Sequence, residues 1–288
     1  MLSAATSGLP VTSRFPDILS VRADPKKMSE IMPQLDVELI PAFQDNYIYL
    51  LRTPGSDAVG IVDAGDAAPA IAVLEREGLT LTHVFNTHHH PDHVGGNAAL
   101  KARYPDAEII GPRSEVARIP EMTRTVVEGD QVEFGGISFK VLEIPGHTTG
   151  HIAFWSDAGK AVFCGDTLFA MGCGRMFEGT PPQFWSSLGK LKALPADTRV
   201  YCGHEYTQTN ARFTRSIDPD NAAVAAQSAE VDRLRTAGQP TIPSTIGLEI
   251  ETNPFLRADD PVIARNVGLA GADPVEVFAE VRRRKDRF

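Results

Sequence analysis

Short apolar runs with the spacing of strands occupy much of the chain between residues 37 and 202. Alternating or continuous apolar residues over about four to eight positions predict strands, and a period of about 3.6 residues predicts a helix. The pattern predicts one helix over 67–77, closed by Gly78, and another over 95–103 that stops before Pro105. We predict strands over 37–41, 47–51, 58–63, 81–86, 108–111, 131–134, 138–144, 151–156, 161–164 and 199–202.

Because the strands are interrupted by only a few helices, the pattern does not fit a doubly wound parallel sheet. It favours an α/β (α+β) protein in which two sheets pack face to face with helices outside. From about residue 206 the pattern becomes helical. We therefore predict three parts: an amino-terminal extension over 1–35, a sandwich domain over 36–206 and a small helical domain over 207–288.

Within the helical part, an Ala-rich segment over 219–236 predicts a helix capped by Asp218. Residues 242–257 carry no clear period and are predicted to be irregular. The last helix is predicted over 273–285. Asp273 is a favourable N-cap, Pro274 suits the first helical position, and Glu276 is placed to complete a capping box.

The first 34 residues mix Ser, Pro, Gly and charged residues without a period. We interpret them as a poorly ordered extension, with Met28 or Met32 as the functional start. Arg14 and Arg22 faintly suggest a transit peptide, but two nearby aspartates weaken that alternative.

The composition argues against several classes of function. The 288-residue chain has a formal net charge of −9, whereas general nucleic-acid binding needs a basic surface. No apolar run approaches the roughly 18 residues that span a bilayer. Three cysteines, too few for a disulfide framework, suit a reducing compartment, so we expect a cytoplasmic protein with buried thiols.

A cluster of histidines indicates a candidate metal-binding site. The loop between the strand over 81–86 and the following helix contains His88, His90, Asp92 and His93. Imidazole and carboxylate groups are the usual protein ligands of zinc and related metals. The spacing of His88 and His90 in an extended loop directs both rings the same way, and Pro91 then turns the chain.

Three more potential ligands, His147, Asp166 and His204, follow other predicted strands, each close to a glycine. Six terminal ligands and one bridging carboxylate, Asp166, would hold two metal ions a few ångströms apart. Such a pair acidifies a bound water and polarises a carbonyl group. Asp63 is either an acceptor for a ligand imidazole or a simple turn residue. The remaining histidines are interpreted as structural or supporting: His83, His89 and His151.

Residues 87–93 match the THxHxDH pattern, and the chain here resembles the metallo-β-lactamase superfamily. That resemblance implies an αββα sandwich over about residues 36–205, with a dinuclear metal site, but it does not fix the substrate. It implies that the ligands are His88, His90, Asp92, His93, His147, Asp166 and His204. Zinc is the metal we expect, with iron or manganese as alternatives.

Four further segments resemble the glyoxalase II (hydroxyacylglutathione hydrolase) family: 40–47, 172–179, 253–257 and 282–286. The resemblance implies that Arg282 and Lys285 bind the glycine carboxylate of glutathione. It also implies that Arg175, Phe177 and Tyr206 line the same pocket. The family often has Lys at the position of Arg175 and Tyr at that of Phe177, and a missing hydroxyl predicts binding weaker by about 0.5–1.5 kcal/mol.

The resemblance implies hydrolysis of S-D-lactoylglutathione to D-lactate and glutathione by a metal-bound hydroxide, with Asp92 and Asp166 as catalytic residues. We expect a small-molecule substrate, no nucleic-acid or membrane partner, and a monomer or weak dimer. One alternative is another enzyme of this fold that acts on glutathione-linked sulfur, such as a persulfide dioxygenase with one iron. A β-lactamase, a nuclease and a metal-binding protein without turnover fit the residues less well.

Overall fold

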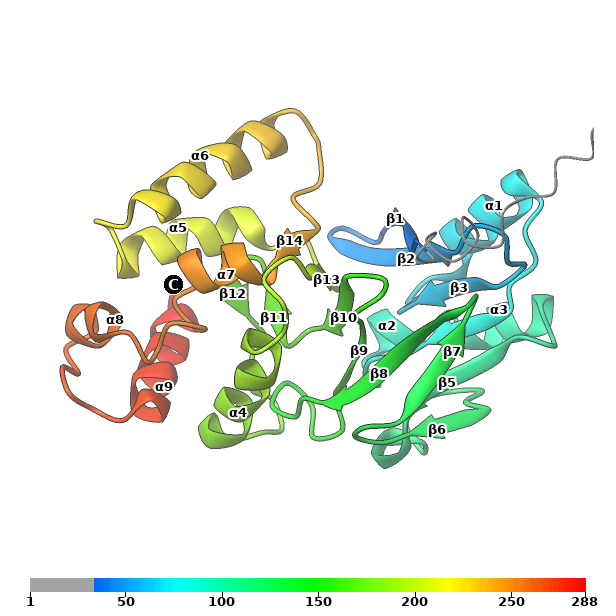
Figure 1. The fold of residues 1–288 in the computed structure, drawn as a ribbon, viewed down its shortest axis with the longest axis horizontal. Helices are drawn as coiled ribbons and strands as arrows, with labels where there is room; N and C mark the ends of the chain where they lie inside the picture. Colours follow the sequence, from blue (N-terminus) through cyan, green and yellow to red (C-terminus); the bar gives the residue numbers. More distant parts are fainter. Residues whose placement is uncertain (1–33) are drawn as a thin grey trace, which may run out of the picture. The chain divides into compact units, whose positions relative to one another are not determined.

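The computed structural model describes residues 34–288. The interpretations of residues 1–33, including the start at Met28 or Met32, lie outside this range. Two six-stranded sheets pack against each other, and helices cover the outer faces (Figure 1). The result is the predicted α+β sandwich, followed along the chain by a helical region.

The first sheet has the strand order β1-β2-β3-β4-β5-β6. Its strands are β1 (Asp36–Ala42), β2 (Asn46–Arg52), β3 (Val59–Val62), β4 (His83–Phe85), β5 (Glu108–Pro112) and β6 (Arg124–Val126). The pairs from β1 to β3 are antiparallel, and those from β3 to β6 are parallel. The parallel pairs place the carboxyl ends of neighbouring strands at one edge of the sheet.

The second sheet has the order β14-β13-β10-β9-β8-β7. Its strands are β7 (Gln131–Phe134), β8 (Ile137–Glu143), β9 (Ile152–Ser156), β10 (Ala161–Gly165), β13 (Arg199–Cys202) and β14 (Ser244–Thr245). Only β10 and β13 are parallel. A separate hairpin consists of β11 (Leu168–Phe169) and β12 (Gly172–Cys173).

Two apolar cores hold these layers together. Between the sheets, the ring of Phe85 packs against those of Phe139 and Phe154, with centroids 5.6 and 5.2 Å apart. On the other face of the first sheet, Ile61 and Val84 pack against α1 (Ala67–Glu77) and α3 (Asn97–Arg103). The period of two in the strands therefore gives each sheet an apolar inner face.

Helices from α4 (Pro181–Lys192) onward extend the core between the sheets, and the first of them, α4, precedes β13. The others are α5 (Thr207–Ile217), α6 (Ala222–Thr236), α7 (Ile246–Thr252), α8 (Pro261–Asn266) and α9 (Pro274–Lys285). Phe184 on α4 meets Phe278 on α9 edge to face at 5.7 Å. Asn253 ties α7 to the β11–β12 hairpin, because its side-chain amide donates to the carbonyls of Phe169 and Gly172.

Several sequence predictions need correction. Asp218 does not cap the Ala-rich helix: that helix begins after Asn221, whose side chain accepts from its first turn, while Asp218 ends α5 and pairs with Arg257. Residues 242–257 are not irregular, because they contain β14 and α7.

The helix predicted over 95–103 is present as α3, which begins two residues later, at Asn97, whereas part of the predicted histidine loop is helical. A four-residue helix, α2 (Pro91–Val94), precedes α3, and Pro91 occupies its first turn. Asp273 caps α9 as predicted, but it accepts from Val275 N, and no capping box with Glu276 forms.

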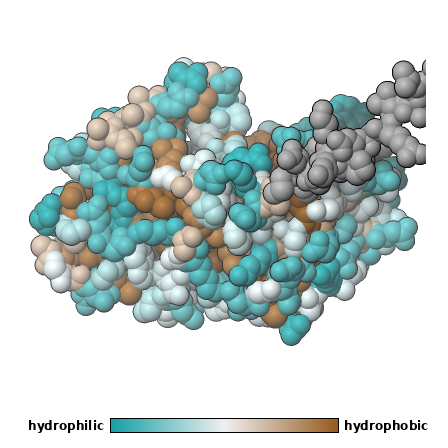
Figure 2. Space-filling model, in the orientation of Figure 1, coloured by the Kyte–Doolittle hydropathy of each residue, from teal (hydrophilic) through white to brown (hydrophobic). Residues whose placement is uncertain are grey.

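Within residues 34–288, no helix is long and apolar enough to cross a membrane. The face in Figure 2 is mostly hydrophilic, with hydrophobic residues in small groups among the polar ones. The three cysteines are buried and free, as expected.

Candidate metal centre and substrate pocket

The predicted ligands converge from both sheets. His88 and His90 lie in the loop after β4, and Asp92 and His93 are on α2, which follows directly. His147 follows β8, Asp166 follows β10 and His204 follows β13. The structure therefore brings all seven predicted ligands together, four from the first sheet and three from the second.

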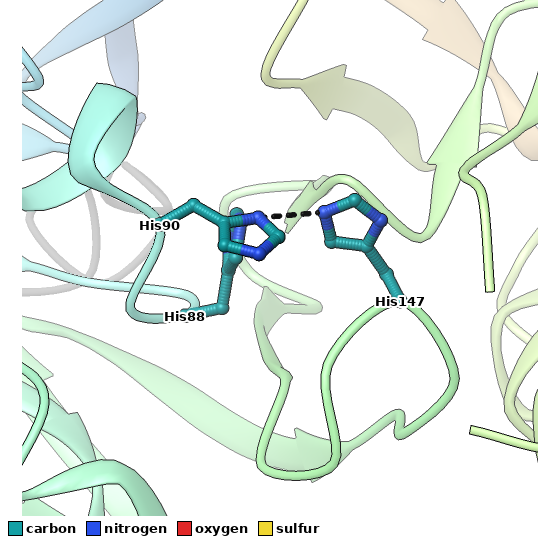
Figure 3. A group of neighbouring side chains, drawn as sticks. All are labelled: His88, His90 and His147. Atoms are coloured by element: carbon teal, nitrogen blue, oxygen red, sulfur yellow. Dashed lines mark hydrogen bonds between the residues drawn. The ribbon is translucent and has the colours of Figure 1, made fainter. Parts of the chain in front are cut away.

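His88, His90 and His147 form a first group that could hold a metal ion. His90 Nδ1 lies 3.1 Å from His88 Nε2 and 2.9 Å from His147 Nε2. Figure 3 shows the three rings directed toward one another. Metal–nitrogen bonds of about 2.0–2.1 Å in a tetrahedron separate ligand atoms by roughly 3.3 Å, so this spacing suits a single ion with little adjustment.

Asp92, His93 and His204 form a second group. Asp92 Oδ2 is 3.7 Å from His93 Nε2 and 3.4 Å from His204 Nε2. We call the first set the three-histidine group and the second the Asp92 group. Each combines ligands from both sheets.

Asp166 lies between the two groups. Its Oδ1 is 3.4 Å from His93 Nε2, and its Oδ2 is 3.4 Å from His147 Nε2 and 3.3 Å from His204 Nε2. One carboxylate therefore reaches ligand atoms of both groups, as a bridging ligand must.

Glycines allow this close approach. Gly165 has φ +47°, and a Cβ there would lie 2.3 Å from Thr87 Oγ1. A Cβ on Gly203 would lie 2.5 Å from Asp166 Oδ1. Larger residues would push the ligand loops apart.

The two groups differ electrostatically. Burial lowers the pKa of His88 well below its usual value and that of His90 to about 4. Burial also lowers the pKa of the two imidazoles in the Asp92 group, but there the neighbouring carboxylates, Asp166 foremost, outweigh it. The pKa of His93 is raised well above its usual value, and that of His204 is raised to about 10. The Asp92 group therefore lies in the more negative field.

The residues fit divalent metal ions. Among the described residues, His93 Nε2 and Asp166 Oδ1 are buried polar atoms without a hydrogen-bond partner, and both face the proposed site. Buried polar atoms are normally paired, and a metal ion would supply the missing partner. The donor set of five imidazoles and two carboxylates suits zinc, iron or manganese.

Oxygen atoms behind the rings fix their orientation. Asp63 Oδ2 is 3.1 Å from His93 Nδ1, and its carboxylate also accepts from the backbone and hydroxyl of Thr87. The sequence left two roles open for Asp63, and this geometry is that of an acceptor for a ligand imidazole. Asp63 also adopts a left-handed backbone conformation, with φ +51°.

Sequence reasoning missed two further contacts. Asp45 Oδ1 lies 2.9 Å from His204 Nδ1, and Asn46 Nδ2 donates to Asp92 Oδ2 at 3.1 Å. Asp45 ends the turn between β1 and β2, and Asn46 begins β2. The resemblance marked the segment 40–47, but it did not indicate these partners, which are far away in the chain.

The remaining histidines lie outside both groups. His151 Nε2 accepts from Asp166 N at 3.1 Å. His89 faces the buried carboxylate of Glu115 at 2.9 Å, and His83 packs on Phe85 and Phe134. These positions fit the supporting or structural roles that we expected.

A cavity of about 810 Å³ opens beside the metal ligands and reaches the last helix. The predicted substrate-binding residues all line it: Arg175, Phe177, Tyr206, Arg282 and Lys285. Tyr206 stacks on His204 with ring centroids 4.7 Å apart, and Phe177 meets His147 edge to face at 5.3 Å. The proposed binding residues therefore share one cavity with five of the seven predicted ligands, all except the buried His88 and His93.

The two cations predicted to grip one anion have different surroundings. Arg282 is only 3% exposed, and its guanidinium donates to Cys173 O at 2.8 Å and pairs with Asp286. Within residues 34–288, Lys285 has no carboxylate partner at salt-bridge distance, and burial together with neighbouring Arg282 lowers its pKa to about 8. Arg282 is thus already engaged, whereas Lys285 is available to an anion.

Two family models match almost all of the described chain. One, described as the metallo-beta-lactamase superfamily, matches residues 43–204 and covers all seven predicted ligands. The other, described as the hydroxyacylglutathione hydrolase C-terminus, matches residues 205–288. The fold and the ligand set thus define a metallo-β-lactamase-fold protein that binds divalent metals.

Among solved structures, ETHE1 from Myxococcus xanthus is 26% identical with a TM-score of 0.62, covering 86% of this chain and 90% of that one. TTHA1623 in a di-iron-bound form is 27% identical with a TM-score of 0.55, covering 76% and 99%.

Curated relatives are closer. Hydroxyacylglutathione hydrolase of Rhodospirillum rubrum is 52% identical over 89% of this chain and 100% of the relative. That of Ruegeria pomeroyi is 52% identical over 88% and 99%. The chain belongs to the hydroxyacylglutathione hydrolase family, glyoxalase II, of the metallo-β-lactamase superfamily.

Proposed function

We propose that this protein hydrolyses the thioester of S-(2-hydroxyacyl)glutathione, chiefly S-D-lactoylglutathione, to D-lactate and glutathione. The observation that carries the proposal is one cavity that is lined both by five of the seven predicted metal ligands and by the cations of the final helix, with the other two ligands, His88 and His93, buried directly behind it. The names of the relatives and the match of the C-terminal model support the same activity.

We assign His88, His90 and His147 to one ion, and Asp92, His93 and His204 to the other, with Asp166 shared. Two zinc ions are the cofactors we favour, with iron or manganese as alternatives. Such ions, when bound, supply Lewis acidity and an acidified water.

The chain's own residues orient this chemistry. The carbonyl of Arg175 lies 2.9 Å from His147 Nδ1, so the loop that meets the substrate also fixes a ligand ring. We propose that Asp92, held by Asn46 and His204, is the group that accepts a proton in the reaction. Tyr206 and Phe177 offer aromatic faces beside the ligands.

Binding of the glutathione moiety falls to the other end of the cavity. We propose that Lys285 contacts the glycine carboxylate and that Arg175, which is exposed, adds a second cation. Arg282 contributes its positive field while its guanidinium holds the backbone of residues 173–174. On this view, residues 36–206 form the metal-binding domain and residues 207–288 the substrate-binding domain.

The test is a spectrophotometric assay of S-D-lactoylglutathione hydrolysis, with metal analysis of the same sample. We expect turnover with about two metal ions per chain. Asp166→Ala should lose turnover, because it removes the ligand that the two ions share. Full activity of Asp166→Ala with unchanged metal content would contradict the bridged site. Oxygen consumption with glutathione persulfide, in place of thioester hydrolysis, would instead identify a persulfide dioxygenase.

We also propose a cytoplasmic location and a monomer or weak dimer. Three buried free thiols suit a reducing compartment. Cell fractionation tests the location, and light scattering on the purified protein tests the oligomeric state.

A further inference from the structure

The turn between β1 and β2 contacts metal ligands that come from both sheets. Asp45 Oδ1 lies 2.9 Å from Nδ1 of His204, a ligand that follows the second sheet. The next residue, Asn46, is 7% exposed and donates its amide to Asp92 Oδ2 at 3.1 Å and to Asp92 O at 3.3 Å. Two consecutive residues therefore contact two of the three ligands in the Asp92 group.

Backbone hydrogen bonds fix this turn to the His204 segment. Tyr47 N donates to Gly203 O at 2.8 Å, and Glu205 N donates to Asp45 O at 2.8 Å. These two bonds lie on either side of His204 in the chain. The backbone of Asp45 is thus fixed beside His204, and this places its carboxylate against the imidazole.

The partners of the three-histidine group are chemically different. His88 Nδ1 lies 3.0 Å from the Thr87 hydroxyl, and His147 Nδ1 lies 2.9 Å from the Arg175 carbonyl. Both are neutral oxygens. In the Asp92 group, by contrast, both imidazoles face carboxylates, since His93 is held by Asp63 and His204 by Asp45.

A carboxylate behind an imidazole makes the ring a stronger donor and adds negative charge near the cation. We propose that Asp45 and Asn46 are positioning residues that set the metal affinity of the Asp92 group and leave the three-histidine group unaffected. The inference rests on the proposed assignment of ligands to two ions. It further predicts that the Asp92 group binds its ion more tightly than the three-histidine group.

The experiment separates the two groups by removing one ligand from each. His90→Ala weakens the three-histidine group, and His204→Ala weakens the Asp92 group. Asp45→Asn is then added to each background, and Zn²⁺ is titrated into the metal-free proteins with a competing chelator. With His90→Ala, Asp45→Asn weakens the remaining tight site by roughly 10- to 100-fold. With His204→Ala, it leaves the remaining site unchanged.

Asn46→Ala provides a second variant that acts on a different ligand, and it follows the same pattern in the His90→Ala background. Asp57→Asn is the matched control: Asp57 is exposed in the β2–β3 loop, and this change leaves Zn²⁺ affinity unaltered in both backgrounds. Circular dichroism checks the fold of each variant, and Asp45→Asn, which is nearly isosteric, carries the test if Asn46→Ala does not fold.

Equal weakening in both backgrounds would mean that the turn only supports the structure, and no weakening in either would remove its role. Failure of both backgrounds to bind Zn²⁺ would also overturn the inference. The readout is metal affinity, so a chain that binds Zn²⁺ as expected but does not hydrolyse thioesters would disprove the proposed activity alone.

Discussion

The fall in activity at high pH tests directly whether Lys285 binds the substrate. Burial and the nearby Arg282 lower the pKa of the Lys285 ammonium group to about 8 in the free protein. Its charged fraction therefore falls from about nine-tenths at pH 7 to about one-tenth at pH 9, one unit on either side of that pKa. If only the charged form binds the glycine carboxylate, kcat/KM falls roughly tenfold over this interval.

The free energy of the Lys285–carboxylate contact is large enough to allow a tenfold fall in kcat/KM. A tenfold change corresponds to about 1.4 kcal/mol, and hydrogen bonds to charged groups contribute about 1.5–3 kcal/mol. The sign follows from the direction of the shift: raising the pH removes the proton and the attraction. A bound carboxylate favours the charged form, so the fall in activity at saturating substrate moves to higher pH.

The assay is hydrolysis of S-D-lactoylglutathione between pH 6 and about 10, fitted for kcat and KM separately. Lys285→Arg is the matched variant, because guanidinium stays protonated throughout this range. It keeps the cation and loses the decline near pH 8. A substrate whose glycine carboxylate is replaced by an amide loses the decline with the unmodified enzyme as well. The reasoning is refuted if Lys285→Arg declines at the same pH as the parent protein.

Three further predictions follow from the cavity wall. Arg282→Ala lowers the free energy of urea unfolding by about 2–4 kcal/mol, because it leaves the Cys173 carbonyl unpaired, whereas Lys285→Ala changes it by less than about 1 kcal/mol; equal losses would contradict this. Gly174→Ala lowers kcat/KM roughly 10- to 100-fold, since its Cβ would lie 1.9 Å from Asp166 O, and unchanged kinetics would refute the constraint. Phe177→Tyr lowers KM about 2- to 10-fold without altering stability, because Phe177 is 62% exposed; a raised KM would argue against a missing hydroxyl contact.

The sequence predicted the sandwich and the convergence of the ligands well, for a physical reason. Strands with clear apolar patterns were found almost to the residue, as in β7 and β13. Because ligands such as His147 and His204 follow strands that meet at one edge, their proximity could be inferred before any coordinates. Helix caps were harder to predict: Asp218 and Asn221 are both suitable cap residues, and only tertiary packing assigns Asp218 to Arg257.

Contacts between distant segments could not be predicted in the same way. Nothing near Asp45 or Asn46 indicates that they face His204 and Asp92, since those contacts depend on how the two sheets pack. The same holds for Arg282: its position on the last helix was predicted, but its hydrogen bond to the Cys173 carbonyl was not. The helix α4 was not among the predicted helices, although Thr180 and Gln183 form a capping box at its start and so provided a local signal.

Each group of ligands takes side chains from both sheets, and this has a consequence for the energetics of the fold. An ion that binds only when the sheets are packed stabilises that packing by mass action, by about 4 kcal/mol when its free concentration is a thousand times the dissociation constant. Removal of the ions should therefore raise the rate of amide hydrogen exchange in β4 and β13 together. The reaction centre would then also act as a cross-link between the halves of the sandwich, so that metal supply in the cell governs the protein's lifetime as well as its activity.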